Sequence, residues 1–181
     1  VGSVTSGYRP EDWVRAIRHG VKPTGQPIFA MPSEDYNRLT DADLAAMVAY
    51  LEQVPDARGG AAVIELPLPV RALYGVGVIK DAAAKIDHTR APEPPVPEGA
   101  TAEHGRYVGN LCMGCHGATM SGGTIPGAPP AWPAAPNLTP GEGSVMPRYA
   151  DAQAFISMMR GGRRGDGSAI AVMPFEAFGH M

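Results

Sequence analysis

Cys112, Cys115 and His116 are the residues whose types and spacing point most directly to chemistry in this chain. They form the pattern Cys-x-x-Cys-His, the signature of a covalently attached c-type haem. Two thiols three positions apart can each add to one vinyl group of the same porphyrin. The histidine that follows is then placed where its imidazole can bind the iron. The pattern therefore predicts one haem c held by two thioether bonds, with His116 as an axial ligand.

Two other kinds of site also use a Cys-x-x-Cys pair. A structural zinc site needs four ligands, and the chain has only these two cysteines. A thioredoxin-type redox pair belongs to a strand–helix context, and no strand is predicted upstream of Cys112. Haem attachment is therefore favoured over both.

The composition is that of a globular protein. Of the 181 residues, 44% are hydrophobic and 18% are charged, and the net charge is −3. This charge is too small to indicate a nucleic-acid partner, and no apolar run is long enough for a membrane-spanning helix. Because the chain has 23 glycines and 19 prolines, long loops are expected. We predict an all-α fold with Gly/Pro-rich loops, in which the haem supplies much of the apolar core.

Two segments align without a gap when the sequence is shifted by 142 residues. The pairs with shared chemistry include Trp13/Phe155, Arg18/Arg160, Gly20/Gly162, Gly25/Gly167, Ile28/Ile170, Met31/Met173 and Pro32/Pro174. Two copies do not make a solenoid, so they indicate a duplicated domain. At this offset, the partner of Cys112 would lie roughly thirty residues before Val1, and the helix after Leu39 has no counterpart in the second copy. We therefore expect a fragment of a longer chain, truncated at both ends.

Capping residues and hydrophobic spacing predict two helices in the first copy. Pro10 begins a helix that runs to about His19 and ends at Gly20. Thr40 and Asp43 resemble a capping box at the start of a second helix. That helix carries an apolar stripe, formed by Leu44, Met47, Val48 and Leu51.

The remaining helices are expected in the second copy. One over 101–112 leads into the haem motif, and one capped by Asp151 runs to about Arg160. Three side chains of the latter are expected to face inward: Phe155, Ile156 and Met159. The segment between the copies, 54–100, is a proline-rich connector whose last part, 91–99, should be extended.

Met173 is the predicted second axial ligand. It lies 57 residues after His116, far enough to reach the opposite haem face, and a proline follows it. It also aligns with Met31, the corresponding candidate ligand of a first haem whose attachment site is missing. The rival is Met146, which also precedes a proline but lacks a repeat partner. The alternatives are a methionine packed in the core and a histidine ligand, either His104 or His180.

The motifs resemble those of the multi-haem cytochrome c subunits of bacterial membrane-bound dehydrogenases, such as those for alcohol, gluconate and aldehyde oxidation. The shared elements are Gly105-Arg106-Tyr107, Cys112-Met113-Gly114-Cys115-His116-Gly117, Ser121-Gly122-Gly123, Asn137-Leu138-Thr139-Pro140, Arg160-Gly161-Gly162 and Met173-Pro174, and in the first copy Arg18-His19-Gly20, Met31-Pro32 and 41–51. The resemblance implies class I cytochrome c domains. It places Asn137 and Thr139 near a haem propionate, and a proline carbonyl within 129–136 on His116.

By this resemblance, the domains are 1–53, the C-terminal half of a first cytochrome c domain; 54–100, the connector; and 101–181, a second cytochrome c domain that lacks its last helix. The helices over 40–53 and 101–112 each lack their partner. One hypothesis is that they dock on each other and complete a hybrid domain around the Cys112 haem.

Electron transfer is the predicted function. An iron ligated on both faces has no open position for a substrate, so the chain would be an electron carrier and not an enzyme. We expect it to pass electrons from a dehydrogenase catalytic subunit to a quinone, an oxidase or another cytochrome, with a second haem implied upstream. Haem c chemistry predicts the periplasm, with any attachment to the cytoplasmic membrane in the missing segments. The alternatives are a peroxidase- or reductase-type haem enzyme with an open distal position, and a purely structural docking domain.

Overall fold

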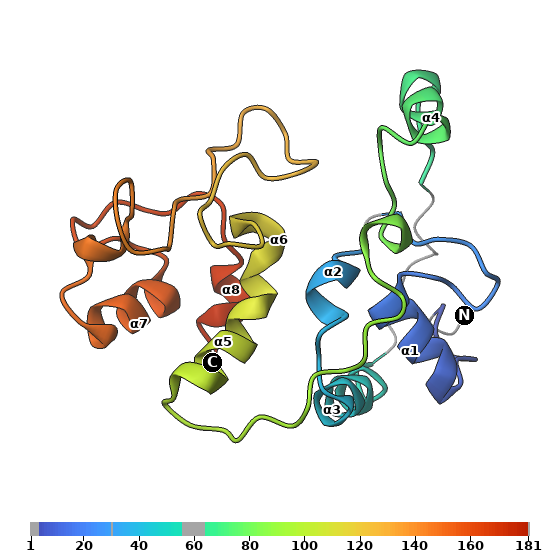
Figure 1. Cartoon of the computed structure of the whole chain (residues 1–181), viewed down its shortest axis with the longest axis horizontal. Coiled ribbons are helices and arrows are strands. Elements are labelled where there is room, and N and C mark those ends of the chain that lie inside the picture. The colour runs from blue at the N-terminus through green and yellow to red at the C-terminus, as the bar shows by residue number, and fades with distance from the viewer. Residues whose placement is uncertain (1–3, 30, 56–63, 181) are drawn as a thin grey trace. The chain divides into compact units, whose positions relative to one another are not determined.

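The computed structural model describes residues 4–29, 31–55 and 64–180 (Figure 1). Its regular elements are α1 (Pro10–His19), α2 (Ser33–Tyr36), α3 (Asp41–Leu51), α4 (Leu68–Gly75), α5 (Ala102–Gly109), α6 (Met113–His116), α7 (Ala152–Gly161) and α8 (Phe175–Phe178), with the 3₁₀ turns η1 (Ala83–Lys85), η2 (Asn110–Cys112) and η3 (Met146–Arg148). Over these residues, β-pairing is limited to isolated bridges. The predicted all-α fold is therefore confirmed.

No helix in the described part of the chain has both the length and the apolar character needed to cross a membrane.

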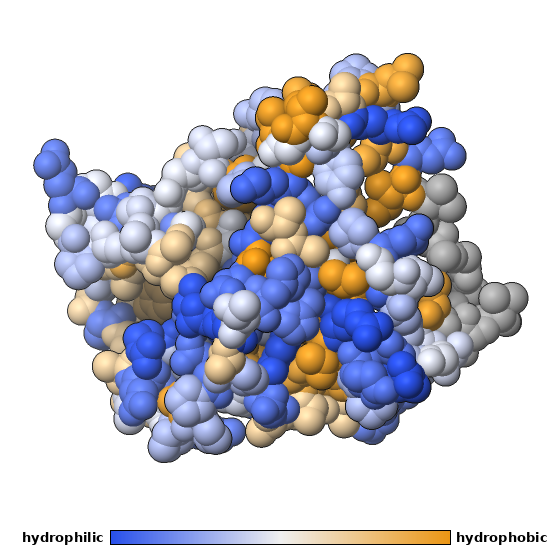
Figure 2. All heavy atoms as spheres, turned by 45° about the vertical axis from the view of Figure 1, so that its right-hand side comes forward, coloured by the Kyte–Doolittle hydropathy of each residue, from blue (hydrophilic) through white to orange (hydrophobic). Residues whose placement is uncertain are grey.

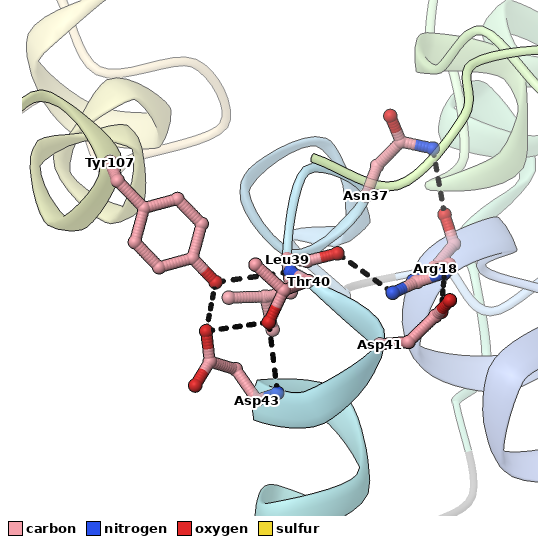
Figure 3. Close-up of polar contacts among 7 residues, drawn as sticks. All are labelled: Arg18, Asn37, Leu39, Thr40, Asp41, Asp43 and Tyr107. Carbon is pink, nitrogen blue, oxygen red and sulfur yellow. Dashed lines mark hydrogen bonds and ion pairs between the residues drawn. The ribbon is translucent and has the colours of Figure 1, made fainter. Parts of the chain in front are cut away.

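The chain divides into two compact units, Val1–Leu111 and Cys112–Met181. This division differs from the sequence-based boundary at residue 101, because α5 groups with the first unit. Polar groups join α5 to α3. The hydroxyl of Tyr107, on α5, accepts a hydrogen bond of 3.0 Å from the backbone N–H of Thr40, and it donates one to the carboxylate of Asp43 (Figure 3). Thus the helix that leads into Cys-x-x-Cys-His contacts the first turn of α3.

The apolar core of the first unit lies between α1 and α3. Trp13 and Ile17 of α1 are buried together with Leu44 of α3, and the partly buried side chains around them are Tyr8, Met31, Tyr36, Met47 and Val48. The apolar stripe predicted for α3 therefore packs on α1. In the hybrid-domain hypothesis, the helices over 40–53 and 101–112 dock on each other. The structure has a contact between α3 and α5, made by polar groups of the first turn of α3 and by Tyr107.

Arg18 joins α1 to the start of α3. Its side chain is buried, and its guanidinium donates to the carbonyl of Leu39 at 2.7 Å and to the carboxylate of Asp41 at 2.8 Å (Figure 3). Thr40 caps α3 as predicted, since its hydroxyl oxygen accepts from the N–H of Asp43 at 3.0 Å. The start of α3 is thus held from both α1 and α5.

The two aligned segments have the same structure. α1 and α7 begin and end 142 positions apart, and so do α2 and α8. Both first helices end at a left-handed glycine, Gly20 with φ 63° and Gly162 with φ 64°. In both copies a backbone hydrogen bond closes the following loop. The N–H of Ile28 donates to the carbonyl of Gly20 at 2.7 Å, and the N–H of Ile170 donates to the carbonyl of Gly162 at 2.9 Å. Met31 and Met173 therefore occupy equivalent places before α2 and α8.

The side chains of α7 differ in one respect from the sequence-based expectation. Met158 is buried, and Phe155 and Met159 are half-buried, but Ile156 is 39% exposed. The inward position predicted for Ile156 is therefore wrong. Residues three and four positions after Phe155 share its helix face, whereas Ile156 is rotated by about 100° from it.

The connector is partly folded, although 56–63 lies outside the described residues. Its helix α4 buries none of its side chains, and apolar groups stay on the surface (Figure 2), with Leu68, Val76 and Val78 each more than two-thirds exposed. The next part of the connector packs on the loop that follows α1, because the fully buried Ala82 donates its N–H to the carbonyl of Ile28 at 3.1 Å.

Candidate haem site

A continuous helical path presents the Cys-x-x-Cys-His motif. Thr101 caps α5 by accepting from the N–H of His104 at 3.1 Å, and η2 and α6 carry the chain on to His116. Cys112 is half-buried, Cys115 is exposed, and neither is in a disulfide. Side chains three positions apart on a helix lie on the same face. Both thiols therefore lie on one face, as attachment to a single porphyrin requires.

His116 is held in one tautomer. Its side chain is buried, and Nδ1 lies 3.0 Å from the carbonyl oxygen of Pro136. Because a carbonyl only accepts hydrogen bonds, Nδ1 must carry the hydrogen, and Nε2 keeps its lone pair for a metal. Metal-ligating histidines usually show this arrangement. A proline carbonyl was expected within 129–136, and the structure identifies it as that of Pro136.

Pro136 is positioned by a pair of backbone segments. Gly123 and Ala135 exchange two hydrogen bonds of 2.9 and 2.8 Å, and the N–H of Gly122 donates to the carbonyl of His116 at 2.9 Å. Ala135 is buried. These bonds tie the loop before Pro136 to the end of the haem motif. From the sequence, Gly122 was named as part of a shared motif but given no role, and Ala135 was not named. The Gly-Gly pair is the signal that marks a place of close backbone approach.

Asn137 and Thr139 follow directly and form a local turn. The side-chain oxygen of Asn137 accepts from the N–H of Thr139 at 2.8 Å and from its hydroxyl at 2.7 Å. The N–H of Leu138, between them, donates to the carbonyl of Met120 at 2.9 Å. Asn137 and Thr139 thus lie next in sequence to the acceptor of His116, and their contact with a haem propionate stays a prediction.

The two candidate methionine ligands lie in different settings. Met173 is half-buried in the turn before α8, where its carbonyl accepts from the N–H of Phe175 at 2.8 Å. Met146 is half-buried too and begins η3. Burial does not separate them, so the argument for Met173 remains its equivalence with Met31. In the first unit, Met31 packs against the Trp13 cluster.

The second unit has little apolar core of its own. Among its described residues, the buried apolar side chains are those of Ala135 and Met158. Most of its larger apolar groups are only half-buried, and Trp132 and Ile156 are exposed. The half-buried groups include Met113, Met120, Leu138, Val145, Met146, Phe155, Met159, Ile170, Met173 and Phe178. A unit of this size needs a further source of stability, such as a disulfide or a metal. A covalently held porphyrin meets that need, so these residues fit a haem.

Three of the four other histidines contact groups outside the haem motif. His104 Nδ1 contacts the backbone of Gly99, and His19 Nδ1 lies 3.2 Å from His88 Nδ1. His180 is exposed. Across the part of the chain that the structure describes, no three His, Cys, Asp or Glu side chains form a group that could hold a metal ion.

No protein-family model matches the chain. A search of curated proteins finds a relative from Gluconobacter japonicus that is 35% identical over 78 residues, which is 42% of this chain. That relative is the cytochrome subunit of a fructose dehydrogenase. The match spans only 16% of the relative's length. The similarity supports a cytochrome c subunit of a dehydrogenase, and with it electron transfer and haem c.

Proposed function

We propose that this chain carries electrons through one haem c, attached at Cys112 and Cys115 and ligated by His116 and Met173. The hydrogen bond of 3.0 Å from His116 Nδ1 to Pro136 O carries the proposal, since it orients the imidazole and leaves the Nε2 lone pair for the iron, in the same motif as two thiols that are in no disulfide. When bound, the haem supplies exchange of one electron at the iron. The chain's own residues attach the cofactor, orient the imidazole and exclude water from it.

A His/Met pair of ligands favours electron transfer over catalysis, because it leaves no open position on the iron. The sulfur ligand also stabilises the ferrous state and raises the potential. Asn137 and Thr139 would hold a propionate, and Met31 would ligate a second haem attached upstream. The equivalence of Met31 and Met173 in the repeat supports this assignment.

We further infer a place between a dehydrogenase and the respiratory chain. The relative is a subunit of a fructose dehydrogenase, so a catalytic subunit of that general kind is the proposed electron donor. A quinone, an oxidase or another cytochrome would accept the electrons. Because mature haem c is made outside the cytoplasmic membrane, we place the protein in the periplasm.

Three matched variants test the ligand assignment. The chain is produced with a haem c maturation system, and absorption spectra are recorded in both oxidation states. The native protein should be low-spin, with the weak near-infrared band of sulfur ligation. Met173→Ala should become high-spin and bind added imidazole at once, whereas Met31→Ala and Met146→Ala should keep the native spectrum.

Each other outcome has a definite meaning. Loss of the near-infrared band in Met146→Ala would identify Met146, and not Met173, as the second axial ligand. A native protein that is high-spin and binds ligands readily would contradict the electron carrier and support a haem enzyme with an open distal position.

A further inference from the structure

Gly122 allows the acceptor of His116 to come close. Its φ is +75°, and an ideal Cβ built on it would lie 2.3 Å from Ala135 O and 2.6 Å from both the carbon and the oxygen of the Pro136 carbonyl. Real Cβ atoms essentially never lie under 3.0 Å from such atoms. Any side chain at this position must therefore push the two backbone segments apart.

A side chain at position 122 would displace mainly Pro136. The distance from Cβ to Ala135 O must grow from 2.3 Å to at least 3.0 Å, that is, by 0.7 Å or more. Ala135 resists this movement because it is buried and shares two hydrogen bonds with Gly123. The ring of Pro136 fixes its φ, so the local backbone has little freedom to compensate. The carbonyl that faces His116 is consequently displaced.

We propose that Gly122 is a positioning residue that sets the haem potential through the His116–Pro136 hydrogen bond. This inference rests on the proposed function, since it takes His116 as the iron ligand. A carbonyl that accepts the Nδ1 hydrogen makes the imidazole a stronger electron donor through Nε2. A stronger donor stabilises the oxidised iron and lowers the potential. Loosening this bond therefore raises the potential.

Gly127 supplies a matched control. Its φ is also +75°, but an ideal Cβ on it has nothing within 4 Å. Gly122→Ala and Gly127→Ala thus impose the same backbone strain, and only Gly122→Ala adds the clash. Both are prepared as holoprotein, and two quantities are measured: the midpoint potential by spectroelectrochemistry, and hydrogen exchange of the His116 Nδ1–H by NMR in the reduced state.

We expect Gly122→Ala to raise the midpoint potential by about 60 mV, a roughly tenfold shift of the one-electron equilibrium towards the ferrous state. Exchange of the Nδ1–H should also become faster than in the native protein. Gly127→Ala should leave both quantities at their native values. A general loosening of the fold would alter the two variants alike.

Pro136→Gly tests the same bond without a clash, because it frees the backbone that carries the carbonyl. It should raise the potential even where Gly122→Ala does not fold. Equal shifts in Gly122→Ala and Gly127→Ala, or an unchanged potential in both Gly122→Ala and Pro136→Gly, would overturn the inference. A native protein without low-spin haem would instead overturn the proposed function, and this inference with it.

Discussion

Ala82 occupies the space that a side chain at Gly20 would need. An ideal Cβ on Gly20 would lie 2.7 Å from the Cβ of Ala82, which is completely buried. Gly20 also has φ +63°, the left-handed conformation that ends α1. Two separate requirements, conformation and space, therefore favour glycine over any other residue at this position.

Replacing Gly20 with alanine should lower the free energy of unfolding by about 2–4 kcal/mol, from left-handed strain and overpacking. Gly25→Ala is the control, since Gly25 has φ +83° and nothing within 4 Å of an added Cβ. That variant should lose only the strain component, about 1–2 kcal/mol. Urea unfolding followed by Trp13 fluorescence in a Trp132→Phe background measures both. Equal losses of unfolding free energy in the two variants would show that Ala82 moves aside without cost, and would contradict the prediction.

Thr40→Ala should destabilise the first unit by about 1 kcal/mol, because the N–H of Asp43 loses its side-chain acceptor at the start of α3. Thr40→Ser retains the hydroxyl and should remain close to the native stability. The same fluorescence-detected unfolding compares the three proteins. If serine and alanine gave the same loss, the threonine methyl group and not the cap would be responsible.

Tyr107→Phe should weaken the contact of α5 with α3 by about 1 kcal/mol, since the buried N–H of Thr40 then lacks its acceptor. Hydrogen exchange of the Thr40 amide gives a local measurement. The amide should exchange faster in the variant, whereas the amide of Ile28, bonded to Gly20, should not change. Unchanged exchange at Thr40 would contradict the contact.

The same tyrosine predicts an alkaline dependence. Burial, and then the hydrogen bond to Asp43, raise the pKa of Tyr107 above its ordinary value of 10.0. The neutral hydroxyl is therefore favoured by folding. Its contribution to stability is complete below about pH 10 and is lost as the pH rises through the raised pKa. The difference in urea midpoint between the native protein and Tyr107→Phe should shrink over this range, and a constant difference would contradict the prediction.

The pair of His19 and His88 predicts an acid dependence. His88 Nε2 must donate to Ala83 O, 3.0 Å away, so in the neutral pair His88 Nδ1 accepts from His19 Nδ1–H. Burial, followed by the charges of His88 and Arg18, lowers the pKa of His19 from 6.5. The neutral form is favoured by folding, so this stability is present above about pH 6.5 and is lost as the pH falls through the lowered pKa. NMR titration should show the pKa of His19 rising in His88→Ala.

Local rules predicted much of this fold because their causes are local. The helix over Pro10–His19 ends at Gly20 as expected, and Thr40 and Asp151 accept the N-terminal hydrogen bonds predicted for them. The repeat was visible in the sequence because glycines with positive φ and a Met-Pro pair recur at one offset. In the haem site, the family resemblance predicted a proline carbonyl within 129–136 next to His116, and the carbonyl of Pro136 lies there.

Features that depend on distant contacts were not predictable in the same way. Nothing near Ala82 in the sequence indicates that it covers Gly20, since the two are brought together by folding of the connector. The role of Gly122 depends on the approach of Pro136, fourteen residues away. The pattern of a single sequence shows which residues are small, but it does not show which distant residues pack against them.

The equivalent of Gly20 in the second copy is covered differently: the ring of Phe175 lies 3.1 Å from an ideal Cβ on Gly162. The first copy has the smaller, fully buried Ser33 at that position, and Ala82 of the connector fills the space instead. A recombination breakpoint anywhere between α3 and Ala82 would therefore separate the first copy from the residue that packs over Gly20. A breakpoint after His88 would keep Ala82 together with Gly20. The module that can be exchanged at this end of the chain is therefore longer than its helices suggest.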